Sequence, residues 1–212
     1  KLLKNFSGYL QTDGYIVYDS FGNKKNITHL NCMAHARRGF EKALDYDKPR
    51  AEYAMDMFQK LYDIERQARE GNMSPQERYT FRLDQALPVL NELGKWIVET
   101  YKTVLPKSAM GKATAYCIPR WDKLMNYLND GSLEIDNNLA ENAIRPIALG
   151  RKNYLFAGSP RGAERAAMFY SFFGTCKKND VNPFIWLKQV LEVIPQHKAN
   201  RIHELLPQHL KL

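Results

Sequence analysis

Residues 6–44, FSGYLQTDGYIVYDSFGNKKNITHLNCMAHARRGFEKAL, give the clearest indication of fold class. FSGYLQ predicts a strand that ends where Asp13 and Gly14 supply turn residues, and FGNKKN predicts a second turn. ITHLNC then predicts another strand, and MAHARRGFEKAL has the apolar spacing of a helix. Two strands alone do not make a stable sheet, so residues 1–44 are expected to belong to a larger α/β core.

Residues 45–130 have a different pattern, with apolar side chains at helical spacing. In the break GNMSP, Ser74 is expected as a helix N-cap, Pro75 at the first helical position and Glu77 as the partner in a capping box. A further helix in TAYCIPRWDKLMNYL has to be started, kinked or interrupted by Pro119. This region therefore predicts antiparallel helices, and its net negative charge between 45 and 102 argues against a DNA-binding surface there.

Residues 131–194 are expected to return to the core. Asp136 or Asn137 is a natural N-cap for a helix of about two turns that carries Glu141 and ends before Pro146. ERAAMFYSFFGTCKK predicts a second helix, and Asn182 with Pro183 predicts the start of a third. Residues 195–212 are expected to form an irregular or weakly helical tail.

Charge and composition narrow the class of protein. The 212 residues have a net charge of +8, which favours an anionic partner, with nucleic acid the leading candidate. No stretch approaches the roughly 18 apolar residues of a membrane span, and no signal peptide is evident at the start. The three cysteines are far apart and unpaired in motif, which suits a reducing, cytoplasmic location without membrane partners.

The positive charge is concentrated between 142 and 178, where seven basic residues stand against Glu164 alone. The basic residues there are Arg145, Arg151, Lys152, Arg161, Arg165, Lys177 and Lys178. Arginines pair with phosphates, and nearby glycines let the backbone approach them. The residues 154–156, YLF, are expected to form a core strand, with base stacking as the alternative. Lys177 and Lys178 also suit the C-terminus of a helix without any DNA contact.

Carboxylates supply the candidate metal site. Asp13 is expected at a strand end and Glu141 on a helix, and converging carboxylates hold Mg²⁺, or Mn²⁺, in two-metal phosphoryl transfer. The alternative for Glu141 is a surface ion pair with Arg145, four residues on. Glu134 and Asp136 remain open as substitutes for Glu141.

His29, Cys32 and His35 invite a metal interpretation because they lie within seven residues. A structural zinc site needs four ligands, and no second ligand pair stands at motif spacing. We therefore expect these residues to pack structurally. His197, His203 and His209 do not share a helical face and are expected to be solvated tail residues.

Four motifs in this order, LQTDGY, HLNCMAHARRGF, EIDNNLAENAIRPIALGRKNYLFAGS and GAERAAMFYSFFGTCKKNDVNPFIWL, resemble the insertion sequence 66 family of bacterial transposases. The resemblance implies a DDE-type enzyme that cleaves and joins DNA with divalent metal. It also implies a ribonuclease H-like core, interrupted by an all-helical insertion before its Glu. By position, Asp13 resembles the family's second catalytic Asp and Glu141 its catalytic Glu. Cys32 and His35 resemble a structural signature found after the second Asp.

The resemblance further implies a first catalytic Asp well upstream of QTDGY, and neither Asp19 nor another early acid stands in its context. The chain is thus expected to be the C-terminal part of a transposase, inactive alone, with an incomplete two-metal site. Expected partners are transposon-end and target DNA, a second copy covering the sheet edge, and other proteins of the same element. The rival functions are a ribonuclease H-like nuclease that only hydrolyses, and a non-catalytic DNA-binding or regulatory remnant of a transposon.

Overall fold

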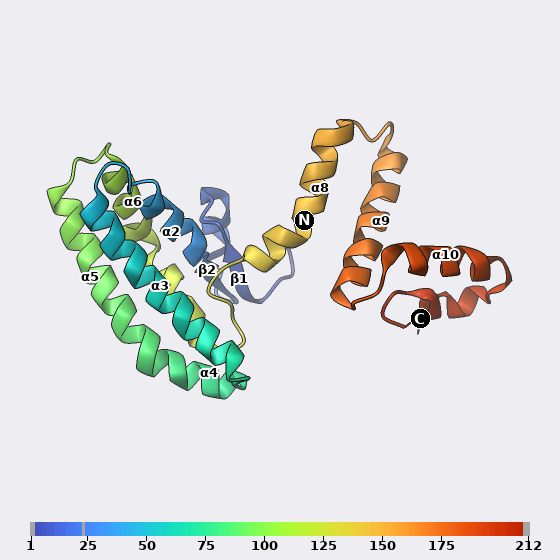
Figure 1. Ribbon diagram of the computed structural model, residues 1–212, viewed down its shortest axis with the longest axis horizontal. Coiled ribbons are helices and arrows are strands. Elements are labelled where there is room, and N and C mark those ends of the chain that lie inside the picture. Colours follow the sequence, from blue (N-terminus) through green and yellow to red (C-terminus); the bar gives the residue numbers. More distant parts are fainter. Residues whose placement is uncertain (1–2, 23, 210–212) are drawn as a thin grey trace. The chain divides into compact units, whose positions relative to one another are not determined.

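The computed structural model describes residues 3–22 and 24–209 (Figure 1). The chain divides into two compact units, Lys1–Asn138 and Leu139–Leu212. The positions of the two units relative to one another are not determined, so each is described by itself.

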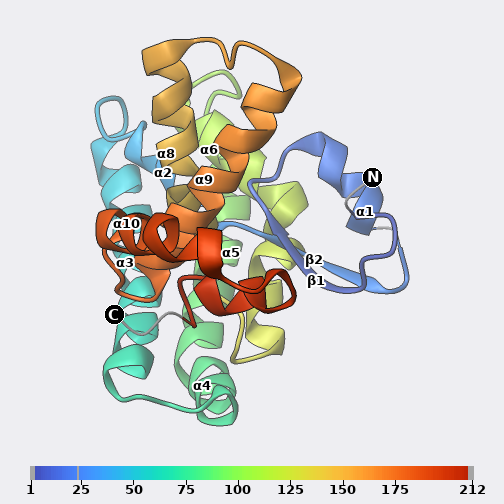
Figure 2. The same cartoon turned by 90° about the vertical axis from the view of Figure 1, so that its right-hand side faces the viewer.

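The first unit contains the two predicted strands. β1 (Gly8–Thr12) and β2 (Ile27–Asn31) pair in parallel, from Gly8 opposite Ile27 to Thr12 opposite Asn31 (Figure 2). The connection holds a 3₁₀ turn at Ile16–Tyr18 and the short helix α1 (Asp19–Gly22). In the turn predicted for residues 21–26, Asn23 lies outside the described residues.

Helices make up the rest of this unit, as the sequence predicts for residues 45–130. They are α2 (Met33–Glu41), α3 (Lys48–Glu70), α4 (Pro75–Phe81), the π turn η2 (Arg82–Ala86), α5 (Leu87–Thr103), α6 (Ala109–Cys117) and α7 (Trp121–Met125). The capping box of Ser74 and Glu77 is confirmed at the start of α4. Pro119 interrupts the helix predicted for TAYCIPRWDKLMNYL, where a 3₁₀ turn, Ile118–Arg120, separates α6 from α7.

The core of the first unit joins the sheet to the helices. Leu30 of β2 and Met33 and Phe40 of α2 are fully buried together with Phe58 of α3 and Leu93 of α5. The rings of Phe40 and Phe58 lie 5.6 Å apart between centroids. The helical region therefore does not fold apart from the two strands but shares one core with them.

A buried ionic network also fixes this unit. The fully buried Arg82 donates from Nε to Glu65 Oε1 at 2.7 Å and from Nη2 to Glu65 Oε2 at 2.8 Å. It further donates to the carbonyl oxygens of Tyr127, Asp130 and Leu133. Arg78 joins Glu65 to Glu134. The network thereby ties α3, α4 and η2 to the segment that leads to Asp136.

The second unit contains three helices with two 3₁₀ turns, Ile194–Gln196 and Ala199–Leu205, among its described residues. The helices are α8 (Asn138–Tyr154), which starts at the last residue of the first unit, α9 (Pro160–Lys178) and α10 (Pro183–Val193). Asn182 caps α10 as predicted, since its Oδ1 accepts from the amides of Phe184 and Ile185. The predicted tail is largely 3₁₀, and its last positions, 210–212, lie outside the described residues.

The prediction that the Glu141 helix ends before Pro146 is wrong. α8 continues for eight residues past Pro146 to Tyr154. Proline has a φ compatible with a helix, although its missing amide costs the helix one hydrogen bond. Ile147, Ala148 and Leu149 follow it, and the helix propensity of Ala148 and Leu149 offsets that loss. The residues 151–153, RKN, therefore belong to the helix of Glu141 itself.

The core strand predicted for residues 154–156 is also wrong. Tyr154 is the last residue of α8, and Leu155 has a φ of 52°. Leu155 and Phe156 are 73% and 83% exposed, so neither forms a core. Apolar, β-prone residues indicate a strand only where neighbouring chains supply pairing partners, and here they follow a helix directly.

Packing within the second unit runs through aromatic side chains. Gly150 of α8 lets Tyr170 of α9 approach, and the hydroxyl groups of Tyr154 and Tyr170 lie 3.1 Å apart. Trp186 of α10 stacks near Phe172 of α9 and donates to the Leu205 carbonyl oxygen at 2.9 Å. Within residues 3–22 and 24–209, no helix combines the length and apolar character needed to cross a bilayer.

Candidate active site and nucleic-acid interface

Asp13 directly follows β1, so its predicted place at a strand end is confirmed. Its side chain is exposed, and Oδ1 accepts a hydrogen bond from the Tyr15 amide at 2.9 Å. Its carbonyl oxygen accepts from the Tyr116 hydroxyl at 2.7 Å. The backbone at Asp13 is thus fixed from α6, while the carboxylate faces outward.

Gly14 makes this contact possible. Its φ is +83°, and a Cβ there would lie 2.7 Å from the Tyr116 hydroxyl oxygen. Arg120 donates to the Gly14 carbonyl oxygen at 3.2 Å and stacks 4.4 Å from the centroid of the Tyr116 ring. Burial raises the pKa of Tyr116 to about 12, so this hydroxyl stays a donor at neutral pH. Neither Tyr116 nor Arg120 could be found from the sequence, because more than a hundred residues separate them from the turn.

Two buried polar side chains, Thr12 and His29, lie next to the Asp13 turn. Thr12 Oγ1 lies 2.8 Å from His29 Nε2 and accepts from the Gly14 amide at 3.3 Å. Burial lowers the pKa of His29, with the nearby Lys123 adding to that effect. His29 is therefore neutral at pH 7 and engaged with the turn that carries Asp13.

Cys32, directly after β2, is the N-cap of α2, and His35 lies in the first turn of that helix. Cys32 is fully buried, its amide donates to the Thr12 carbonyl oxygen at 2.9 Å, and burial raises the pKa of its thiol. His35 is half-buried, and its amide donates to the Cys32 carbonyl oxygen at 3.2 Å. Cys32 thus connects the end of β2 to β1, the strand that precedes Asp13.

Glu141 lies in the first turn of α8, in the second unit. Asp13 belongs to the first unit, and since the units are not placed relative to one another, the convergence of the two carboxylates stays a prediction. Arg145 follows Glu141 by one helical turn, so their surface ion pair also stays open.

The two alternative acids are held by other groups. Arg78 Nη1 donates to Glu134 Oε1 at 3.1 Å, and Arg78 Nη2 donates to Oε2 at 3.2 Å. Asp136 accepts from the Tyr62 hydroxyl at 2.8 Å and from the Asn138 amide at 3.0 Å. Burial, and then the charge of Asp136, raises the pKa of Tyr62, so the hydroxyl remains a donor. Glu134 and Asp136 therefore fix the segment that leads into α8, through their hydrogen bonds to Arg78, Tyr62 and the Asn138 amide.

Four of the five basic residues predicted to contact DNA lie at one end of a helical hairpin, and the fifth, Arg145, lies in the first half of α8. Arg151 and Lys152 lie in the last turn of α8, and Arg161 and Arg165 lie near the start of α9 (Figures 1 and 2). All four are exposed, and none makes an ion pair with another described residue. Ten helical residues from Glu141 to Arg151 span roughly 15 Å. The name hairpin tip is used below for Arg151, Lys152, Arg161 and Arg165.

Hard oxygen ligands are present for a divalent cation, though a complete set is not. Asp13 Oδ2 takes part in no hydrogen bond to another described residue, which suits coordination of Mg²⁺ or Mn²⁺. Within residues 3–22 and 24–209, no group of three or more His, Cys, Asp or Glu side chains gathers closely enough to bind a metal ion. Asp13 therefore fits as one ligand among several.

Comparison with known proteins covers nearly the whole chain. The family model described as "Transposase IS66 family" matches residues 1–165, and the one described as "IS66 C-terminal element" matches residues 171–208. Two relatives from Sinorhizobium fredii, the uncharacterized proteins y4hP and y4jD, are 34% and 32% identical over 98% and 99% of this chain. The uncharacterized protein YuaK of Escherichia coli is 43% identical over 49 residues, 23% of this chain and 52% of its own length.

The chain spans 40% and 42% of the lengths of y4hP and y4jD. No solved structure matches it. The family match includes Asp13, Glu141 and the hairpin tip. The chain therefore belongs to the insertion sequence 66 family of transposases.

Proposed function

We propose that this chain supplies Asp13 and Glu141 to a DDE-type site that cleaves DNA strands and joins them to a target. One observation carries the proposal: an exposed Asp13 carboxylate is held at the carboxyl end of β1 in a chain of a transposase family. Ligands in α/β sheets gather at that edge, where several strands end. The proposal includes a ribonuclease H-like core, of which β1 and β2 are a part.

Asp13 and Glu141 are the residues that would hold divalent metal. When bound, such a metal activates an attacking water or 3′-hydroxyl and stabilises the leaving oxygen. Asp13 contributes an outward carboxylate oxygen, and the Tyr15 amide keeps the other oxygen in place. Tyr116 and Arg120 orient the turn through its two carbonyl oxygens and are positioning residues.

Arg145 and the hairpin tip supply positive charge for the phosphate backbone of the DNA. Arginine suits this task because its planar guanidinium binds a phosphate through two parallel hydrogen bonds. The position of Arg151 and Lys152 on the helix of Glu141 links a phosphate contact rigidly to the proposed catalytic residue.

The test is strand cleavage and joining on supercoiled DNA with Mg²⁺ or Mn²⁺, by the protein expressed from its complete reading frame. Asp13→Asn and Glu141→Gln should each abolish both steps and leave DNA binding in place. Asp56→Asn, at an exposed acid on α3, and Glu164→Gln, at an exposed acid on α9, are the matched controls and should keep full activity.

Three outcomes decide against the proposal. Full cleavage by Asp13→Asn or Glu141→Gln removes that residue from the site. Hydrolysis without any joining favours the ribonuclease H-like nuclease. Metal-independent DNA binding with no cleavage by the unaltered protein favours the regulatory remnant of a transposon.

A further inference from the structure

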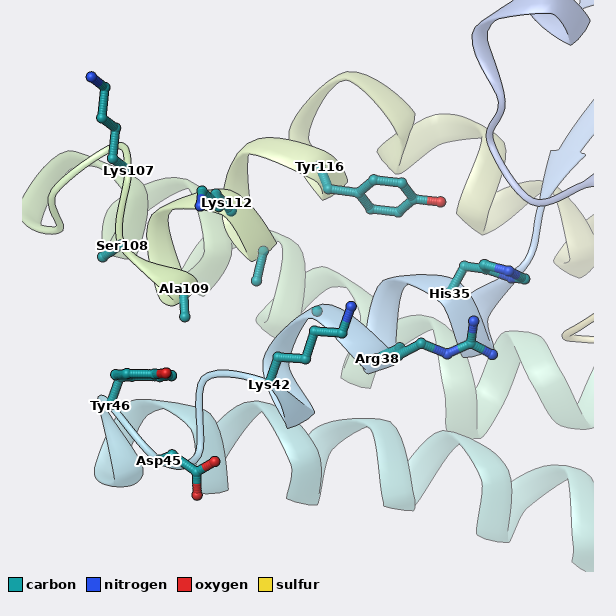
Figure 3. A pocket seen from close by; sticks show the side chains of 12 residues that line it. His35, Arg38, Lys42, Asp45, Tyr46, Lys107, Ser108, Ala109, Lys112 and Tyr116 are labelled. Atoms are coloured by element: carbon teal, nitrogen blue, oxygen red, sulfur yellow. The ribbon is translucent and has the colours of Figure 1, made fainter.

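A groove of about 1040 Å³ lies between α2 and α6 in the first unit (Figure 3). Arg38 and Lys42 come from α2, and Lys112 and Tyr116 come from α6 on the other side. Lys107, in the loop before α6, lines its outer end. The groove is called the α2–α6 groove below.

The charges in the α2–α6 groove are strongly unbalanced. Arg38, Lys42, Lys107 and Lys112 are all exposed, and none of them has an ion-pair partner among the described residues. Among the described residues that line the groove, Asp45 is the one carboxylate. On the same helix, Arg37 lies outside the groove and is paired with Glu41. The cations that face the groove are thus the ones left to bind an anion from outside.

Backbone geometry increases this positive potential. Ser108 and Ala109 line the groove at the N-terminus of α6, where the helix dipole is positive. Gly39 and Ala113 form the floor, and a Cβ on Gly39 would lie 3.2 Å from the Cβ of Ala113. Because the two helices meet through small residues, their cations lie on both sides of the groove.

At its inner end, the α2–α6 groove reaches the side chain that holds the Asp13 turn. Tyr116 lines this end, and its hydroxyl is the group that donates to the Asp13 carbonyl oxygen. From Ala109 to Tyr116, α6 covers roughly 10 Å. That is the axial rise of about three nucleotides of one DNA strand.

We infer that the α2–α6 groove binds the phosphate backbone of a DNA strand that leads to the phosphodiester at Asp13. This inference rests on the proposed function. It places a DNA contact beside residues 45–102, whose net negative charge argued against a DNA-binding surface. Lysines and arginine in an open channel suit phosphates, and the 81% exposed Tyr46 at the outer end offers a ring for base stacking.

The test is the affinity of this chain for a fluorescein-labelled single-stranded oligonucleotide, measured by anisotropy across a salt series. Lys42→Gln with Lys112→Gln should lower affinity roughly tenfold and reduce the log–log salt slope by about 1.4, since each lost phosphate contact on a single strand removes about 0.7. Lys48→Gln with Lys102→Gln is the control, because these lysines pair with Glu52 and Glu99 outside the groove. Lys42→Arg with Lys112→Arg should restore binding.

Two results overturn the inference. One is an unchanged salt slope in the groove double variant when circular dichroism shows it folded. The other is displacement of the oligonucleotide by poly-L-glutamate at equal charge concentration, which would indicate an acidic protein partner.

Asp13→Asn separates this inference from the proposed function. The variant should bind the oligonucleotide like the unaltered chain and, in the complete protein, lose cleavage. If it still cleaves while the groove variant binds weakly, the catalytic proposal fails and the groove stands. If it loses cleavage while the groove variant binds and cleaves normally, the groove inference fails alone.

Discussion

At the scale of single residues, the turn after β1 depends on a glycine and two distant side chains. Gly14 adopts φ +83° directly below the Tyr116 hydroxyl and the Arg120 guanidinium. The place of Asp13 at the end of a strand was predictable, because a strand pattern followed by Asp and Gly is a local signal of a turn. Tyr116 and Arg120 were not, since only the tertiary fold brings α6 to this turn.

Gly14→Ala is expected to destabilise the first unit by about 1–3 kcal/mol, because it adds backbone strain and displaces Tyr116. Gly8→Ala is the matched control: Gly8 has φ +112°, but a Cβ there meets nothing within 4 Å. Urea unfolding of both variants separates strain from displacement. Equal losses would show that the contact with Tyr116 carries no weight.

Arg82→Lys is expected to destabilise the first unit by about 3–5 kcal/mol, despite keeping the charge. A lysine has three donors on one atom and cannot serve Glu65 and three carbonyl oxygens at once. Arg66→Lys, at an exposed surface pair with Asp63, should change stability little. Urea unfolding measures both, and similar losses would contradict the role given to the buried network.

At the scale of elements, sequence periodicity located the helices better than their ends. Ser74 and Asn182 marked helix starts correctly, because a side-chain cap is a local interaction. Pro146 was misread as a helix end, because proline weakens a helix without always ending it. The π turn η2, which aligns Arg82 with Glu65, had no sequence signal.

The Glu65 network predicts how unfolding depends on pH. Burial alone raises the pKa of Glu65, but the hydrogen bonds and charges of Arg82 and Arg78 outweigh it and lower the pKa overall. A lowered folded-state pKa adds stability above the unfolded value of about 4.3, and this is lost as the pH falls through the folded value. Urea unfolding at pH 7 and below pH 4 should show this loss. A Glu65→Gln variant, less stable at pH 7, should show a shallower acid dependence.

Pro146→Ala is expected to stabilise α8 by up to about 3 kcal/mol, because it restores an amide donor in the middle of the helix. Hydrogen exchange should slow for amides around position 146. Ala148→Gly, two residues on, is expected to quicken exchange in the same turn. Unchanged exchange in Pro146→Ala would show that the helix is held by its packing rather than by its own hydrogen bonds.

At the scale of the whole molecule, the basic residues proposed to contact DNA form two groups, the hairpin tip and the α2–α6 groove. The sequence predicted a basic stretch between 142 and 178, because its residues are close in the chain, but not that four of them lie at one end of a helical hairpin. It did not predict the α2–α6 groove, because residues 38–42 and 107–112 are joined by a region of net negative charge. Family membership was predictable from four ordered motifs, whereas the relation of Asp13 to Glu141 depends on both units together.

Arg151→Gln with Arg161→Gln is expected to reduce the log–log salt slope for duplex DNA by about 1.8, with each lost contact removing about 0.9. Lys177→Gln with Lys178→Gln, at the opposite end of α9, is the matched control. Anisotropy across a salt series measures both. Equal effects of the two double variants would mean that overall charge, and not the hairpin tip, governs binding.

The hydrogen bond from Tyr116 to Asp13 also has a consequence during synthesis. The donor lies 103 positions after the acceptor, and Arg120 lies 106 positions after Gly14. When β1 and β2 have just left the ribosome, the turn at Asp13 and Gly14 still lacks these two hydrogen bonds, because α6 has not yet been translated. The backbone turn that carries Asp13 is therefore completed only after α6 has been translated and has packed against it.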